Sequence, residues 1–210
     1  MRYKPYMRVA TGLWALDKGV KMIELNLLDS LVTRFTNLFK DYELPSKSGA
    51  LQMVKVFPQF LPQPSGATVK PKSDNQSIVP QGYTATDIES NFPCVVVKLE
   101  EITDKEEGAL DQARASVQII VGTYDGVYDN EKQAYVEAKD CQGYRDVFNI
   151  LEKIRQDLLT MPARVLEGRY RLDMPLTSGL TQEQDWPYFL GYMNMNWEIA
   201  RPLMPNNYDG

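Results

Sequence analysis

Histidine is absent from the 210 residues of the chain. Ser-His-Asp and Cys-His nucleophilic sites and imidazole-ligated zinc sites all need this side chain, because it titrates near neutral pH and supplies a neutral nitrogen ligand. These classes of site are therefore excluded. Carboxylates, lysines or a carboxylate-bound magnesium ion are the remaining catalytic candidates.

Cysteine is scarce, with only Cys94 and Cys141. Two cysteines cannot form a disulfide framework or a four-thiolate metal site, which favours a reducing cytoplasm, and we predict both as small buried hydrophobic side chains. Phosphate-binding loops of the type GxxxxGK[ST] or GxGxxG are also missing. No apolar run approaches the roughly 20 residues that span a bilayer. We expect no cofactor and no membrane partner.

Basic charge is concentrated at the start of the chain. Residues 1–21 hold five basic side chains and one acidic one, a net charge of +4, whereas the other 189 residues hold 18 basic and 27 acidic ones, a net charge of −9. Codons for KGVKM, residues 18–22, are compatible with a ribosome-binding site just before a start codon. Residues 1–21 are then either a translated leader ahead of Met22 as the natural initiator, or a basic arm that docks on a partner.

Two segments have the apolar periodicity of amphipathic helices. The first covers residues 22–41 and ends before Pro45, and the second begins near Gly143 and ends at Pro162. On the second, Asp146 lies in the first turn and favours the positive end of the helix dipole. The alternative role for Asp146 and its neighbour Arg145 is contact with an adjacent subunit.

Residues 45–93 contain seven of the 13 prolines. Within them, residues 51–57 predict a strand and residues 76–79 a shorter partner, while residues 58–76 lack periodicity and predict a loop or a projecting arm. Such a long segment without its own core is uncommon unless it binds something. Phe57, Phe60 and Leu61 are therefore interface candidates, the alternative being a flexible loop. We predict one domain over residues 22–210, with this region as an insertion.

The remainder of the chain predicts four strands and their connections. Residues 95–99 and 113–124 form an antiparallel pair, and the second is predicted to be central and covered on both faces, because Ile120 adds bulk to its second face. Residues 125–140 are an acidic connector. Residues 169–175 form the third strand, and residues 176–185 a turn-rich link.

The last strand, residues 189–199, alternates between a buried and a wet face. Its buried side holds Phe189, Gly191, Met193, Met195, Trp197 and Ile199, and its wet side Tyr192, Asn194, Asn196 and Glu198. Trp186 and Tyr188 lie at its entrance and are either interface anchors or part of the core. The order of elements predicts an α+β fold: a mostly antiparallel or mixed β-sheet with helices packed on one face, plus a proline-rich projecting arm.

Acidic residues are the only candidates for a metal site. Glu100, Glu101, Glu106 and Glu107 surround a polar turn without convergent geometry, which favours a solvated charged loop over a magnesium site. We therefore predict no catalytic, metal-binding or cofactor-binding residues.

Four stretches carry a resemblance to a known family. They are PCVVVKLEE, VQIIVGTYD, GYRDVFNILEKIRQDLL and RYRLDMPLTSGLTQEQDWPYFLGYMNMNWEIARP. Together they resemble the neck or tail-terminator proteins of long-tailed bacteriophages over residues 93–202 and, loosely, over the first helix. The most unusual succession is GYRD opening an amphipathic helix, then a strand, then a Trp-Pro-Tyr turn into a final strand that ends in Ile-Ala-Arg-Pro.

The resemblance implies a virion structural protein of the phage neck, assembled in the host cytoplasm, and no enzyme. It implies a homo-oligomeric ring, expected to be a hexamer, that caps the tail tube, contacts the tail tube protein and presents a surface to the head connector. DNA would pass through the lumen without specific binding, which suits an acidic body because affinity for phosphate comes from cations.

Three alternatives remain. A head-completion or stopper protein of the same neck differs only in its partners. A carboxylate-dependent metal enzyme acting on nucleic acid would need convergent acidic residues in a cleft. A host-modulating binder made during infection would remain a monomer at high concentration.

Overall fold

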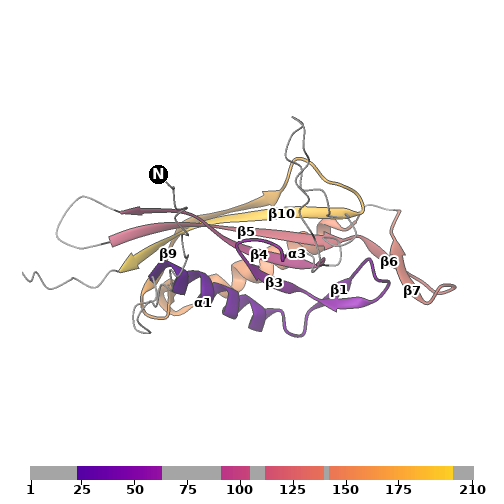
Figure 1. Cartoon of the computed structure of the whole chain (residues 1–210), viewed down its shortest axis with the longest axis horizontal. Coiled ribbons are helices and arrows are strands. Elements are labelled where there is room, and N and C mark those ends of the chain that lie inside the picture. Colours follow the sequence, from indigo (N-terminus) through magenta and orange to yellow (C-terminus); the bar gives the residue numbers. More distant parts are fainter. Residues whose placement is uncertain (1–22, 63–90, 105–111, 140–141, 201–210) are drawn as a thin grey trace, which may run out of the picture.

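The computed structural model describes residues 23–62, 91–104, 112–139 and 142–200 (Figure 1). Several predictions fall outside them: the leader or arm at residues 1–21, the strand at 76–79 and most of the proline-rich arm, and the placement of Glu106, Glu107 and Cys141. These stay predictions.

Two α-helices and ten strands make up the described residues, with a short 3₁₀ helix at Pro162–Arg164. The helices are α1 (Ile23–Leu38) and α3 (Tyr144–Leu159). The strands are β1 (Glu43–Pro45), β2 (Leu51–Met53), β3 (Lys55–Pro58), β4 (Cys94–Asp104), β5 (Gln112–Tyr124), β6 (Gly126–Asp129), β7 (Ala134–Glu137), β8 (Val165–Leu166), β9 (Tyr170–Leu180) and β10 (Tyr188–Ala200).

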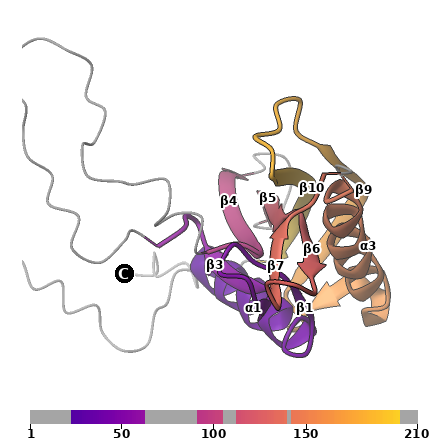
Figure 2. The same cartoon turned by 90° about the vertical axis from the view of Figure 1, so that its right-hand side faces the viewer.

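One six-stranded sheet organises the fold, in the order β3-β4-β5-β10-β9-β8. Neighbouring strands are antiparallel except β3 and β4, which are parallel. α1 packs mainly over β3 and β4, and α3 over β10, β5 and β9. Both helices lie on the same side of the sheet (Figures 1 and 2). The predicted α+β fold, with a mixed sheet and helices on one face, is confirmed.

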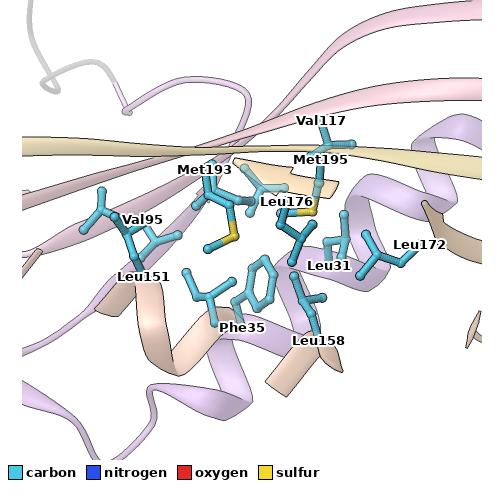
Figure 3. Packing of buried hydrophobic residues seen from close by; sticks show 14 of the residues in the cluster. Leu31, Phe35, Val95, Val117, Leu151, Leu158, Leu172, Leu176, Met193 and Met195 are labelled. Carbon is cyan, nitrogen blue, oxygen red and sulfur yellow. The ribbon is translucent and has the colours of Figure 1, made fainter. Parts of the chain in front are cut away.

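The core lies between the helices and the inner face of the sheet. Met193 and Met195 of β10 point toward Leu31 and Phe35 of α1, and toward Leu158 of α3 (Figure 3). The predicted buried side of the last strand is confirmed, because its members Phe189, Gly191, Met193, Met195, Trp197 and Ile199 are all buried. Each large side chain of this set contributes about 1.5–3 kcal/mol by leaving water.

Three local predictions were wrong. The strand expected at residues 51–57 is two strands, β2 and β3, divided at Val54. The acidic connector contains the β6–β7 hairpin, in which Tyr128 and Tyr135 pack edge to face. The turn-rich link is shorter than expected because β9 continues to Leu180, where it pairs with β10.

Candidate interaction surfaces

The side of the sheet away from α1 and α3, which we call the open face, carries amide and hydroxyl side chains at its centre. Its central rows pair Gln118 with Asn194, and Ser116 with Asn196. The Gln118 amide donates to Asn194 Oδ1 at 3.1 Å. No described helix packs on this face (Figure 2). Within the described residues only the inner face of β5 is covered by helices, so its coverage on the second face stays a prediction.

Charged side chains on the open face are paired with one another. Arg114 Nη2 lies 2.7 Å from Asp173 Oδ2, and Arg171 donates to Glu198. Lys98 Nζ lies 3.3 Å from Glu100 Oε1. Each of these cations has a carboxylate within contact distance, so the three pairs carry no net charge.

One end of the open face is apolar and contains three of the predicted interface residues. We call this group the end cluster; it consists of Phe92, Cys94 and Tyr124, with partly buried Phe57, Leu61, Tyr188 and Leu190 packed against them. The Tyr188 ring lies 5.0 Å from that of Phe92 and 5.6 Å from that of Tyr124. For Tyr188 this packing fits the core alternative, whereas Phe57 and Leu61 pack in a cluster that neither of their two alternatives, partner contact or flexible loop, described.

The other three candidates lie at the surface. Phe60 is 74% exposed and Trp186 is 49% exposed, so Trp186 does not fit the core alternative. Arg145, in the first turn of α3, is exposed as well. Phe60 directly follows Gln59, which has φ of 59°. These exposed aromatic side chains are of the kind that anchors interfaces.

Sequence reasoning missed the exposed apolar side chains of the short hairpins β1–β2 and β6–β7. Val127 and Tyr128 of β6, and Leu51 and Met53 of β2, are each close to half exposed. The two hairpins are joined where the Tyr135 amide donates to the Gly49 carbonyl at 2.9 Å. Alternation in GVYD and AYVE could have indicated the second hairpin, but the surrounding acidic residues obscured it.

Asp146 and Asp125 lie near each other beside the start of α3. Burial raises the pKa of the Asp146 carboxyl above its usual range and the Asp125 charge raises it further, while a hydrogen bond with Asn149 acts in the opposite direction. Burial and, secondarily, the Asp146 charge raise the pKa of Tyr42. Burial and the Asp125 charge therefore act against the benefit expected from the helix dipole at Asp146.

Replacing Asp146 by asparagine should stabilise the protein at neutral pH. A carboxyl with a raised pKa binds its proton more tightly when folded, so the folded state loses stability as pH rises from the ordinary carboxyl value. We expect Asp146→Asn to gain less than about 1 kcal/mol at pH 7, because solvent screens this half-buried group. The gain should vanish below about pH 4, where both side chains are neutral.

Urea unfolding of both proteins at several pH values measures this difference. Asp185→Asn, which removes an exposed carboxylate, is the control and should change little. A variant less stable than the natural chain at every pH would show that the helix dipole and the Asn149 bond dominate after all.

A polar groove of about 740 Å³ lies between α1, the end of α3 and the β8–β9 turn. Two guanidinium nitrogens of Arg34 donate to the two carboxylate oxygens of Asp157, Nε to Oδ2 at 2.5 Å and Nη2 to Oδ1 at 3.0 Å. Ser30 donates to Glu167 Oε1 at 2.7 Å. These bonds join α1 to α3 and to the turn, so the groove walls are held by their own side chains.

The remaining chemical candidates give no reactive centre in the described part of the chain. Cys94 is buried as predicted, and burial raises the pKa of its thiol to about 12, which keeps it protonated and unreactive. Glu100 and Glu101 are exposed as expected, but they lie in strand β4 and not in a loop. Among the described residues, no three His, Cys, Asp or Glu side chains gather closely enough to hold a metal ion.

No protein-family model matches the chain, and a search of curated proteins also gave no match. Within the described ranges, neither helix has the length and apolar character needed to cross a membrane.

Proposed function

We propose that the protein is a virion structural protein of the neck of a long-tailed bacteriophage. Copies of the chain form a ring that ends the tail tube and joins it to the head connector, and DNA passes through the centre. The proposal rests on the stretches within residues 93–202 that resemble tail-terminator proteins, and on the properties of the open face.

The open face carries the proposal because it suits a wall past which DNA must move. Proteins that hold DNA do so with unpaired lysine and arginine side chains that displace counterions from phosphates. On the open face Arg114, Arg171 and Lys98 contact carboxylates of the same chain. Between them lie neutral amides such as Gln118 and Asn194. Such a surface offers phosphate no strong hold.

Exposed aromatic side chains are available for contacts with the tail tube protein and the head connector. Trp186 and Phe60 lie at the surface, and Tyr128 extends on the β6–β7 hairpin, which projects from the body in Figure 1. Interfaces that persist in an assembled particle bury large aromatic residues in their centres. We assign no partner to any one of these residues.

Purified protein should form a closed oligomer and should shorten or cap growing tail tubes of the phage that encodes it. Light scattering after size exclusion measures the oligomer, and negative-stain microscopy measures tube length with and without the protein. Filter binding to duplex DNA at physiological salt should show no retention. A chain that stays monomeric at high concentration and leaves tube length unchanged would overturn the proposal.

A further inference from the structure

The edge of the sheet formed by β3 and β4 is stepped. β3 pairs only with the first residues of β4, from Lys55 opposite Cys94 to Pro58 opposite Val97. Gln59 extends this cover slightly, since its side-chain oxygen accepts from the Leu99 amide at 3.2 Å. Along residues 100–104, which we call the β4 recess, no described strand pairs on this side.

The opposite edge, formed by β8 and β9, is also stepped, but its short outer strand lies at the other end of the sheet. The two residues of β8 pair with Tyr170 and Arg171 at the beginning of β9. Along residues 172–180, which we call the β9 recess, no strand in the described part of the chain pairs on the outer side.

Residues aligned across the sheet show that the two steps match. One row runs Leu166, Tyr170, Ile199, Ala113 and Asp104, so at this end β8 projects on one edge and the β4 recess lies on the other. A second row runs Val56, Val95, Val121, Gly191 and Leu180, so at the other end β3 projects and the β9 recess lies opposite. A second copy placed alongside in the same orientation would seat each projecting strand in a recess.

The charges that flank these steps differ in net sign, although acidic Glu167, which accepts from Ser30, also lies beside β8. Glu100 and Glu101 are exposed at the β4 recess, whereas Arg164 and Arg169 are exposed on either side of β8. Complementary charges steer association and fix the register of a contact. A two-fold contact about an axis normal to the sheet would place β8 of one copy against residues 172–180 of the other, and would not bring Arg169 to Glu101. The steps allow both contacts, and the charges favour the head-to-tail contact, the type that closes into a ring when the rotation fits.

Both edges also carry features that limit strand pairing. Pro58 and Pro175 lack an amide hydrogen, and the registers shift at Glu100 in β4 and between Asp173 and Thr177 in β9. Prolines and bulges at edges prevent uncontrolled sheet extension. A contact between these edges must therefore rely on fitted shape and side-chain charge more than on a long backbone ladder.

We propose that copies of this chain associate head to tail through their sheet edges, with β8 of one copy in the β4 recess of the next. The occupant of the recess is thus a second copy of the same chain. The inference deepens the proposed ring and rests on it for closure, but the edge contact can be measured without any phage component.

A pair of charge reversals tests the contact. Glu101→Arg and Arg169→Glu should each place like charges at every junction, raising the concentration for half-assembly by at least about tenfold. A one-to-one mixture should assemble again, because each variant offers the other a complementary edge. Sedimentation velocity across a concentration series measures assembly. Glu131→Arg and Lys132→Glu, on the β6–β7 turn, are matched controls and should assemble like the natural chain.

Rescue in the mixture also shows that both variants are folded. The inference is overturned if both single variants assemble normally, if the mixture stays dissociated, or if the natural chain does not self-associate. If the rescue succeeds but the oligomer has no effect on tail tubes, the edge contact stands and the proposed neck function fails.

Discussion

Replacing Trp197 by alanine should lower the free energy of unfolding by about 3–5 kcal/mol, the range found when large aromatic side chains are removed from cores. The indole is completely buried between the sheet and the helices. Its neighbours across the sheet are Ala115 on β5 and Leu172 on β9. Ala115 is small enough to leave room for the ring. With alanine at position 197 as well, a cavity would remain that the neighbouring strands cannot close.

Trp186→Ala is the matched control for this experiment. Trp186 is 49% exposed, so its loss should change stability by less than about 1 kcal/mol, in line with surface substitutions. Urea unfolding followed by circular dichroism measures both variants independently of tryptophan fluorescence. Equal losses in the two proteins would contradict the burial that separates them.

Trp197→Phe gives a graded test at the same position. The Trp197 Nε1 atom is buried and has no hydrogen-bond acceptor among the described residues. Phenylalanine removes this unsatisfied donor while keeping most of the apolar volume, so the loss should be clearly smaller than with alanine. A loss as large as that of alanine would mean that the indole N–H has a partner in the folded protein.

Replacing Gly191 by alanine should lower stability by about 1–3 kcal/mol, the usual cost of overfilling a packed core. A Cβ atom at this position would lie 2.4 Å from Val147 Cγ1 and 3.0 Å from the Gly179 carbonyl oxygen. Val147 belongs to the buried face of α3. The clash would therefore separate α3 from β10, and the absence of a side chain at Gly191 is what lets the helix approach the sheet.

Two further variants distinguish this clash from a general effect of glycine replacement. At Gly179 an added Cβ would be no closer than 3.4 Å to Tyr192 Oη, an ordinary contact, so Gly179→Ala should be nearly neutral. In the background of Val147→Ala, Gly191→Ala should cost less than it does alone, because the clashing methyl group is gone. Additive losses in the double variant would show that the close approach to Val147 is not the cause.

Elements with a strong and uninterrupted period were predictable from the sequence. The apolar stripes of α1 and α3, and the alternation of β10 from Phe189 to Ile199, depend only on the geometry of the element and on one buried face. The β6–β7 hairpin was missed because acidic residues surround its short alternating strands, and the extension of β9 to Leu180 was missed because small polar residues and glycine make up most of it. Their strand conformation comes from pairing with a neighbour rather than from local pattern.

The candidate surfaces were predictable by residue type but not by position. The sequence indicated that the aromatic residues near Pro58 and Pro187 take part in packing or binding. The fold then placed Phe57 and Tyr188 together in the end cluster, and left Phe60 and Trp186 at the surface. Alternation along a strand indicates which side chains share a face, but exposure depends on which distant segments pack there.

The amino-acid sequence by itself determined the absence of imidazole chemistry, the α+β class and the inner face of β10, since each follows from residue type and short-range period. The tertiary structure alone decided that neither described helix packs on the other face, that its arginines pair with carboxylates from other strands, and that the described sheet ends in two matching steps. Pairing register joins residues far apart in the chain, such as Arg114 and Asp173, and no local pattern carries that information.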